Sequence, residues 1–514
     1  IRKPYLSVST QQEISNLNSG TLNASDVATL RRQIRSHAAR DKKRWTLRQL
    51  DIDHRSSPAD RWKTIKRVRS KYQPRTQSVC WPSGRPSTAA EKPEVLAQYL
   101  RDTVWKPSSC PPPSLARLFP CLDAAFAPFT MVDIHFALRR LKSRKAPGPD
   151  QVSIDLYKLL PYALRRLLLE YFNSCFLSAS APDHWKLARV VMIFKGGGKN
   201  SRMPSAYRPI SLANSIYKLY AALLQARLAY HFDDRISDLQ YGFRKARSTS
   251  SPLFIIRRLA ELFERHTTSL YILFLDWSQA FDCISHEHLT ASLVRIGLPL
   301  PFVHAISSLY QDGKFFVATP QHTSATYKLS RGIRQGCPLS PYLFILVLSV
   351  LMHDVYSLFE QLFHYTPWTF SARTLVTDIE YADDTVLMAR TQLTLHRLLH
   401  TLQHEACKRG LFLNPDKCQL LRLHSDLPIH LSPCVDPCSP CSCSHCSGTA
   451  PFGPQIHPVN SAKYLGAYIT ANGSSVADCN YRYSQASGAF RSLFPVFTNP
   501  ALVRRRLEIY SQIV

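Results

Sequence analysis

The amino-acid sequence predicts an α+β fold that is built from several subdomains. Three observations support this prediction. Helical spacing of apolar residues begins near Met131, runs of strand-forming residues cover 189–195 and 271–275, and an apolar hairpin surrounds the turn at 381–384. At 514 residues the chain exceeds the usual size of one domain, so we expect two or three subdomains with ample material for a core.

The first 125 residues differ from the rest in composition. Residues 1–75 carry many Lys and Arg side chains with little apolar periodicity, which predicts a basic helical arm. The arm either contacts nucleic acid or is a solvated charged helix without a partner. Prolines then multiply over 76–125, with Pro111, Pro112 and Pro113 in succession, which predicts a poorly packed linker. We therefore expect the globular part of the chain to begin near residue 125.

The charge of the chain indicates a polyanionic partner. Lys and Arg total 64 against 36 Asp and Glu, which gives a formal net charge of +28. Such a surplus repels itself in a compact fold unless an anion neutralises it, so nucleic acid is the favoured partner over an acidic membrane surface or simple solubility. The most apolar run, 342–352, is about half as long as a bilayer helix, so we expect a buried core helix and no membrane partner.

The chain ends and the cysteines bear on the compartment. The first residue is Ile, and no charged and then apolar leader precedes a cleavage site, so we interpret the N-terminus as the edge of a fragment. Most of the 14 cysteines are scattered singly, which suits free thiols in a reducing compartment. We expect an intracellular location, in the nucleus.

Carboxylates follow two predicted strands. Asp276 ends the strand-forming run 271–275, and Asp383 and Asp384 occupy the hairpin turn that begins at Tyr381. An Asp-Asp pair alone occurs in many solvated turns. The repulsion between these acids is also relieved if a cation lies between them and a third carboxylate.

Nucleotidyl transfer needs such an arrangement of acids. One divalent ion lowers the pKa of an attacking hydroxyl group, and a second neutralises the departing pyrophosphate. Magnesium prefers oxygen ligands and retains water and phosphate partners, so a few carboxylates are sufficient. The basic glycine loop at 196–199 can follow a phosphate, although it lacks the residue spacing of a P-loop.

Several longer motifs stand around these acids in a fixed order. From about residue 140 to the end, the sequence resembles the reverse transcriptases of non-LTR, LINE-type retrotransposons. The resemblance rests on the following segments: KAPGPD at 145–150, YRPISL at 207–212, QYGFR at 240–244 with RSTS at 247–250, DWSQAFD at 276–282, GIRQGCPLSP at 332–341, YADD at 381–384, GL with LN and Lys at 410–417, and KYLG at 463–466.

The resemblance implies a right-hand polymerase with fingers, a palm that carries an antiparallel sheet, and a thumb. It implies RNA-directed synthesis of DNA with two Mg²⁺ ions, or Mn²⁺ in their place, on an RNA template, a DNA primer and dNTPs. By residue, it implies metal ligands at Asp276, Asp383 and Asp384, a proton donor at Lys417, nucleotide contacts at Phe281, Gln335, Arg208, Lys195 and Lys199, and template or primer contacts at Arg244, Arg334, Gly336, Tyr381, Tyr464, Leu465 and Gly466. Phe281 would be the gate that excludes a ribose 2′-hydroxyl group.

Two features stay outside this site. Asp282 lies six residues beyond Asp276, a spacing at which we expect its side chain to project away from the ions, so we interpret it as structural and exclude it from the metal site. Six cysteine and histidine residues form a cluster in the predicted insertion: Cys434, Cys438, Cys441, Cys443, His445 and Cys446. They allow one distorted zinc site or an unstructured Ser/Pro/Cys loop, because too little chain separates the two C-x-x-C pairs for two zinc knuckles.

The predicted organisation is a basic arm at 1–75, a linker at 76–125, an N-terminal extension and fingers at 126–270, a palm at 271–480 with a Cys-rich insertion at 425–457, and the start of a truncated thumb at 481–514. Two alternative functions remain. The first is a group II intron-type reverse transcriptase and maturase. The second is an inactive, RNA-binding relic, which the intact acids at Asp276, Asp383 and Asp384 disfavour.

Overall fold

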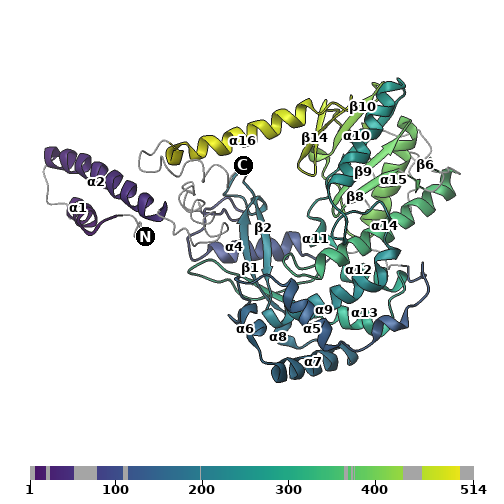
Figure 1. Ribbon diagram of the computed structural model, residues 1–514, viewed down its shortest axis with the longest axis horizontal. Coiled ribbons are helices and arrows are strands. Elements are labelled where there is room, and N and C mark those ends of the chain that lie inside the picture. The colour runs from purple at the N-terminus through teal and green to yellow at the C-terminus, as the bar shows by residue number, and fades with distance from the viewer. Residues whose placement is uncertain are drawn as a thin grey trace. The chain divides into compact units, whose positions relative to one another are not determined.

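A computed structural model describes residues 6–18, 24–50, 78–107, 114–196, 198–363, 369–371, 374–375, 377–431 and 454–497 (Figure 1). The chain divides into two compact units. One combines Ile1–Thr76 with Cys479–Val514, and the other is Gln77–Asp478. The Cys434 to Cys446 cluster, Pro111–Pro113 and the end of the predicted thumb lie outside the described residues.

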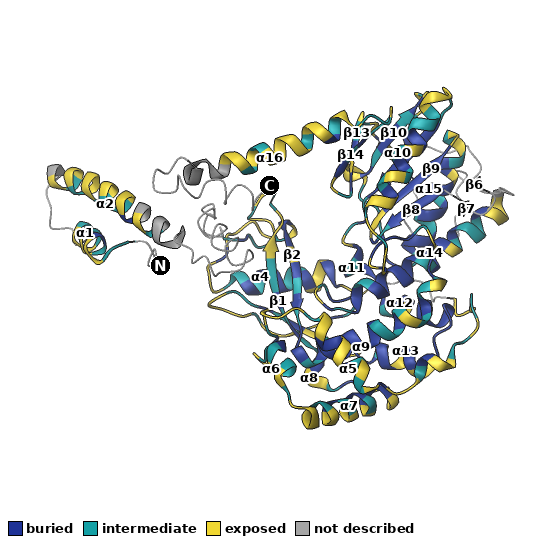
Figure 2. Ribbon diagram, viewed as in Figure 1, coloured by how far each residue is buried: buried dark blue, intermediate teal, exposed yellow. Residues whose placement is uncertain are grey.

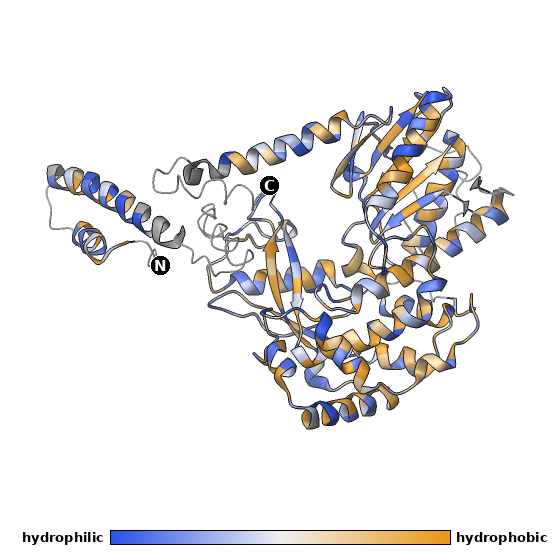
Figure 3. Ribbon diagram, viewed as in Figure 1, coloured by the Kyte–Doolittle hydropathy of each residue, from blue (hydrophilic) through white to orange (hydrophobic). Residues whose placement is uncertain are grey.

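The first unit contains a pair of helices near the N-terminus, α1 (Val8–Asn18) and α2 (Ala24–Leu50). The two helices are joined by the carboxylate of Asp41, which accepts hydrogen bonds from the hydroxyl groups of Ser7 and Thr10, both at 2.6 Å. His37 lies 2.8 Å from Glu13 across the same pair. Helix α2 is largely hydrophilic (Figure 3). It presents exposed arginines at positions 31, 32, 35, 40 and 44. Helix α16 (Val476–Phe497) crosses the boundary between the two units.

The second unit begins with the segment that we expected to be a linker, and that expectation is wrong. Residues 78–107 form α4 (Lys92–Tyr99) and a short π-helix η1 (Leu100–Val104). Their apolar side chains, Leu96 and Leu100 among them, are buried in a core shared with Val190 and Phe315. Prolines at the helix start and in the turns do not prevent burial of the apolar residues between them. The globular part therefore starts near residue 77 and not near 125.

This segment packs on a four-stranded sheet of the fingers. The strands are β1 (Leu187–Phe194), β2 (Tyr207–Leu212), β4 (Lys314–Val317) and β5 (Tyr327–Lys328), in the order β2-β1-β4-β5. β1 and β4 run parallel, whereas the outer pairs are antiparallel. β4 and β5 come from the range predicted to be palm, so the chain returns to the fingers after its first palm strand.

Helices make up most of the remaining fingers. They are α5 (Met131–Arg140), α6 (Ile154–Leu159), α7 (Tyr162–Leu177), α8 (Asp183–Lys186) and α9 (Ser215–Phe232), with the short 3-10 helices η2 (Asp123–Phe126), η3 (Pro204–Ala206) and η4 (Asp233–Arg235). Helix α10 (Ser250–Arg265) falls in the range predicted to be fingers but buries its apolar side chains against the palm strands. Helix α5 starts at a capping box, in which Thr130 and Asp133 satisfy each other's backbone N–H groups. An aromatic core between α7, α8 and α9 packs Phe172, Trp185 and Tyr220 together.

The palm carries the antiparallel sheet that the sequence predicts. Its strands are β3 (Leu270–Leu275), β8 (Asp378–Tyr381), β9 (Asp384–Ala389) and β10 (Gln419–Leu423), in the order β10-β3-β9-β8. All three pairings are antiparallel. Figure 2 shows these strands largely buried.

Helices and small hairpins surround this sheet. The helices are α11 (Ala280–Cys283), α12 (His286–Arg295), α13 (Leu300–Ser307), α14 (Ser340–Phe363), α15 (Gln392–Cys407) and the 3-10 helix η5 (Pro415–Lys417). The small two-stranded sheets are β6 (Thr369–Ser371) with β7 (Thr374–Leu375), β11 (Ile429–His430) with β12 (Gln455–Ile456), and β13 (Ser461–Tyr464) with β14 (Ala467–Thr470).

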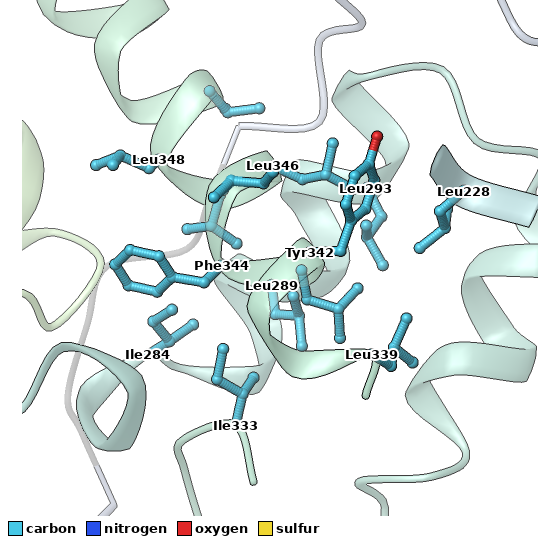
Figure 4. Close-up of a cluster of buried hydrophobic side chains, with 14 of the residues drawn as sticks. Leu228, Ile284, Leu289, Leu293, Ile333, Leu339, Tyr342, Phe344, Leu346 and Leu348 are labelled. Carbon is cyan, nitrogen blue, oxygen red and sulfur yellow. The ribbon is translucent and has the colours of Figure 1, made fainter. Parts of the chain in front are cut away.

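Helix α14 is the central apolar helix of the palm. It has 24 residues, so it is much longer than the run 342–352 from which we estimated its length. By length and composition, Ser340–Leu362 could cross a bilayer, but 67% of its most apolar window is buried inside the protein. Figure 4 shows its side chains Tyr342, Phe344 and Leu346 among Leu289, Leu293 and Ile333. The expectation of a core helix is therefore confirmed.

Candidate active site

The three predicted acids lie at one edge of the palm sheet. Asp276 directly follows β3, and Asp383 precedes Asp384, the first residue of β9. In the antiparallel pairing of these neighbouring strands, Leu275 lies opposite Thr385. The C-terminal end of β3 therefore meets the N-terminal end of β9, and this pairing brings Asp276 beside the hairpin turn.

The acids influence one another electrostatically. The pKa of Asp384 is raised to about 6, first by the loss of hydration and then by the charges of Asp383 and Asp276. The pKa of Asp383 is also raised, by the loss of hydration and by Asp276. Both side chains reach solvent, but the surrounding protein displaces part of their water. A cation between these acids would relieve the repulsion, so an oxygen donor set of this kind fits a divalent metal ion.

A lysine already contacts one of these acids. The Nζ atom of Lys417, in η5, lies 2.6 Å from Oδ2 of Asp276. Its ammonium group balances part of the negative charge of the acids. Within the described residues, no three His, Cys, Asp or Glu side chains are arranged closely enough to form a metal-binding cluster. The structure thus places the acids together at one edge of the sheet, but the described side chains do not lie close enough together to form a complete metal-binding cluster.

A pocket of about 1080 Å³ opens beside the acids, within the second unit. It brings together most of the predicted site residues: Asp276, Asp383, Lys417, Phe281, Gln335, Lys195, Lys199, Arg208, Arg334 and Gly336. On its fingers side, burial and the nearby charges of Lys199 and Arg208 lower the pKa of Lys195. Cations that repel one another around a pocket favour a polyanionic ligand such as a triphosphate.

Phe281 and Gln335 are both held in place by neighbouring side chains. The ring of Phe281 stacks on Phe344 of α14, with the ring centroids 4.6 Å apart and an angle of 17° between the planes. The amide Nε2 of Gln335 donates to Oδ2 of Asp282 at 2.6 Å. Both side chains are therefore oriented by the palm before any ligand binds.

Asp282 lies in the wall of the pocket, although we excluded it from the metal site. It is buried, with 3% of its surface exposed, and Trp105 Nε1 donates to its second oxygen at 3.2 Å. Loss of hydration raises its pKa to about 7, and the hydrogen bonds from Trp105 and Gln335 oppose that rise. Its recorded partners are Trp105 and Gln335, so it supports the pocket wall from behind.

Two arginines predicted to contact the template have little exposed surface and bond to other groups of the protein. The guanidinium group of Arg244 contacts the carboxylate of Asp233 and donates to the carbonyl oxygen of Ser237 at 2.6 Å. Arg334 is 2% exposed and donates to the carbonyl oxygens of Trp185 and Lys186. Arg244 therefore joins segments of the fingers and lies outside the lining of the pocket, which argues against its predicted template contact. Arg334 lines the pocket, and its Nε has no hydrogen-bond partner among the described residues, so its template contact stays a prediction.

The backbone conformation and a close contact both require glycine at position 336. Its φ angle is +105°, and a Cβ atom there would lie 2.8 Å from the carbonyl oxygen of Ser211 in β2. The neighbouring carbonyl group of Gln335 accepts a hydrogen bond from the N–H group of Ser211. The glycine therefore allows the segment to pack against β2 of the fingers sheet, whatever else it contacts.

The predicted primer contacts lie beside the palm sheet and outside the lining of the pocket. Tyr464 is buried against Phe274 of β3, with the ring centroids 5.3 Å apart. Leu465 and Gly466 form the two-residue turn between β13 and β14, with φ angles of +46° and +79°. Tyr381, at the end of β8, is half-buried and packs against the same apolar cluster.

Sequence reasoning missed the residue that holds the acidic turn. Gln240 is fully buried, and its Oε1 accepts hydrogen bonds from the N–H groups of Ala382 at 2.9 Å and Gly242 at 2.8 Å. Its Nε2 donates to the buried carboxyl group of Glu380 at 2.9 Å. Gly242 is required at this contact, because a Cβ atom there would lie 2.2 Å from the N atom of Ala382. The pairing of Gln with Gly at 240 and 242 was the available signal.

Comparison with known proteins agrees with this geometry. Residues 195–469, more than half of the chain, match the reverse transcriptase (RNA-dependent DNA polymerase) family. Among curated proteins, the chain is 27% identical over 343 residues to the retrovirus-related Pol polyprotein from type-2 retrotransposable element R2DM of Drosophila melanogaster. That match covers 65% of this chain and 30% of the relative.

The RNA-directed DNA polymerase from mobile element jockey of the same organism is 28% identical over 373 residues, which is 70% of this chain and 39% of the relative. The chain therefore spans about a third of the length of these relatives. Among solved structures, an apo telomerase from Candida tropicalis aligns with a TM-score of 0.38 and 15% identity over 57% of this chain and 55% of that chain. The extent of the family match and the motifs at the acidic turn agree: this chain belongs to the reverse transcriptase (RNA-dependent DNA polymerase) family.

Proposed function

We propose that the protein is an RNA-directed DNA polymerase of a non-LTR retrotransposon, which adds dNTPs to the 3′-hydroxyl group of a DNA primer on an RNA template. The observation that carries the proposal is the single pocket that joins the carboxylates of Asp276 and Asp383 to the cations of Lys195, Lys199 and Arg208. Acids on one side and cations on the other match the two needs of a nucleoside triphosphate, a metal-binding edge and a phosphate-binding wall.

The acids would hold the metal ions. Asp276, Asp383 and Asp384 provide the oxygen donors, and two bound Mg²⁺ ions would supply activation of the primer hydroxyl group and neutralisation of the departing pyrophosphate. The structure contributes a fixed edge of the sheet, and the mutual repulsion of the acids lowers the cost of accepting cations. Lys417, 2.6 Å from Asp276, has a proton that it can donate to the leaving group.

The pocket walls would select the nucleotide. Phe281, stacked on Phe344, presents a fixed ring in the pocket, where it would clash with a ribose 2′-hydroxyl group. Gln335 also lines the pocket, and Asp282 holds its amide group. Lys195, Lys199 and Arg208 would bind the triphosphate through charge-assisted hydrogen bonds. Together these groups favour a deoxynucleoside triphosphate.

The nucleic-acid partners follow from the charge of the chain. A net charge of +28 favours binding to RNA and DNA, and the exposed arginines of α2 are one described group that can contact a phosphate backbone. We extend the proposal to a nuclear location, where chromosomal DNA could provide the primer. Imaging of the tagged protein would test that location, and exclusion from the nucleus would contradict it.

The test is primer extension with purified protein, an RNA template, a DNA primer, dNTPs and Mg²⁺. Asp383→Asn should reduce the extension rate at least about 100-fold, because it removes one charge from the metal-binding edge. Binding to RNA, measured by fluorescence anisotropy, should stay within about twofold of the wild type, because the turn does not supply positive charge.

The matched control is Asp312→Asn, which removes the same charge at an exposed surface pair with Lys328. That variant should extend primers like the wild type. Equal extension by Asp383→Asn would contradict the assignment of the acids. RNA binding without any extension by the wild type would favour the alternative of an inactive, RNA-binding protein.

A further inference from the structure

The segment 78–107 forms part of the wall of the nucleotide pocket. Tyr99, Leu100 and Val104 line the pocket together with the acids and the fingers cations. The end of the segment is attached to the residues before Gln335, because Nε of Arg331 donates to the carbonyl oxygen of Val104 at 3.0 Å. A stretch expected to be a linker is thus attached to the pocket at its C-terminal end.

Trp105, which follows η1, contacts Asp282 in the wall of the pocket. Its side chain is 4% exposed, and its indole ring meets Phe315 of the fingers sheet edge-on, with the centroids 4.5 Å apart. The indole Nε1 donates to Oδ1 of Asp282 at 3.2 Å. Packing fixes the ring, so the position of its N–H group is fixed as well.

Asp282 connects Trp105 to Gln335. One carboxylate oxygen accepts from Trp105, and the other accepts from Nε2 of Gln335 at 2.6 Å. The two oxygens of a carboxylate lie in one plane, so a donor that fixes one oxygen also fixes the direction of the other. The carboxyl group has little freedom to move away, because only 3% of its surface is exposed.

The orientation of Gln335 decides what it presents to the pocket. A glutamine amide has a donor end and an acceptor end, and rotation by half a turn exchanges them. With Nε2 directed at Asp282, the acceptor Oε1 is left for the pocket, and the structure records no hydrogen bond to it among the described residues. A loosened Asp282 would allow the amide to rotate and would weaken this preference.

We propose that Trp105 is a positioning residue of the nucleotide site, whose indole N–H group holds Asp282 so that Asp282 orients the amide of Gln335 toward the incoming dNTP. This inference rests on the proposed function, because it needs a nucleotide in the pocket. It assigns to the N-terminal segment a role in nucleotide binding, without direct contact between Trp105 and the nucleotide.

The test is Trp105→Phe, which keeps an aromatic ring against Phe315 and removes the N–H group. Steady-state primer extension should show a KM for dNTP raised about 10-fold, since a hydrogen bond to a charged group is lost, while kcat changes less than about twofold. The matched control is Trp81→Phe. The Nε1 atom of Trp81 is buried, with no hydrogen-bond partner among the described residues, so this variant removes an indole N–H group but no recorded bond.

A second measurement separates positioning from simple packing. In a Gln335→Ala background, Trp105→Phe should have little further effect on KM, because the group that it orients is gone. Additive effects of the two substitutions, or an unchanged KM in Trp105→Phe beside an active wild type, would overturn the inference.

Failure of the proposed function would give a different result. In that case the wild type itself would not extend primers, and equilibrium binding of a fluorescent dNTP in Ca²⁺ would replace kinetics. Weaker binding by Trp105→Phe than by the wild type would still support the positioning role. Equal binding by the two proteins, or no binding by either, would overturn it.

Discussion

The two four-stranded sheets of the second unit differ in how they are buried. In the palm sheet, every residue of β3 is buried, because Tyr271, Leu273 and Leu275 enter one core while the alternate residues enter another. The fingers sheet is buried mainly on one face, which packs on α4 and η1, and β1 ends in the exposed residues Ile193 and Phe194.

This difference separates two kinds of functional residue. The acids of the palm stand at the ends of strands that two cores hold, so their positions resist small changes. The cations of the fingers, Lys195 and Arg208 among them, extend from the less buried sheet and are exposed, and among the described residues Lys195 is held only by a hydrogen bond to the carbonyl oxygen of Ser205 at the surface. Substitutions around the palm should therefore affect stability and kcat, and those on the fingers surface should affect the KM for nucleotide.

The largest expected effect is on the helices that support the palm sheet. The carboxylate of Asp354 in α14 accepts hydrogen bonds from Nη1 and Nη2 of Arg295, both at 2.5 Å. It also contacts Arg409, and both arginines are buried. Asp354→Ala should lower the free energy of unfolding by about 3–5 kcal/mol, because it leaves the buried guanidinium group of Arg295 without its carboxylate, whereas Arg409 keeps Glu405. Urea denaturation followed by circular dichroism measures this change.

The control for that experiment lies beside the fingers sheet. Asp312→Ala breaks an exposed pair with Lys328, and it should leave the urea midpoint unchanged. Similar losses of stability in the two variants would contradict the contrast between the two sheets.

A smaller effect is expected at the contact that holds the acidic turn. Gln240→Ala removes the acceptor for the N–H groups of Ala382 and Gly242 and should lower kcat about 10- to 100-fold, because the turn that carries Asp383 loses its support. The KM for dNTP should change little. Primer extension kinetics measure both constants.

Gln225→Ala provides the comparison for this variant, because Gln225 is also buried and accepts from Arg140, within the helices of the fingers. If Gln225→Ala lowered kcat as much as Gln240→Ala, a general loss of stability would explain both results.

The smallest effect is expected on the fingers surface. Arg208→Ala should raise the KM for dNTP about 5- to 10-fold with little loss of stability, because an exposed cation is removed from the wall of the pocket. Arg244→Ala should do the reverse. It should lower the melting temperature by several degrees and leave KM near the wild-type value, since Arg244 joins Asp233 and Ser237 inside the fingers.

Nucleotide titrations and thermal melts of both variants measure these outcomes. A raised KM in Arg244→Ala at full stability would restore the original prediction that this arginine meets phosphate.

The parts of the site that sequence predicted share one property. Asp276, Asp383 and Asp384 stand at the ends of short strands, where local pattern fixes both the strand and its end. Lys195, Lys199, Phe281 and Gln335 are predicted for the same reason, since each belongs to a short motif, and all four line the pocket. The antiparallel palm sheet was implied by the resemblance to reverse transcriptases, and the strand patterns before Asp276 and around the hairpin turn agree with it.

The failures have a common cause as well. A sequence pattern does not show whether an arginine side chain is buried, so Arg244 was expected at the template although its guanidinium group binds Asp233 and Ser237 within the fingers. Residues 76–125 were expected to be a linker because they contain many prolines, but the apolar residues between these prolines are buried in α4.

The sequence by itself determined the family, the acids and the palm strands, because these depend on residues close together in the chain. Only the tertiary structure decided the partners that lie far apart in sequence. Gln240 reaches Ala382, and Trp105 reaches Gln335 through Asp282, across separations that no local pattern records. Burial then decides which of these polar groups must pair, because a buried polar group without a partner carries a cost that an exposed group does not.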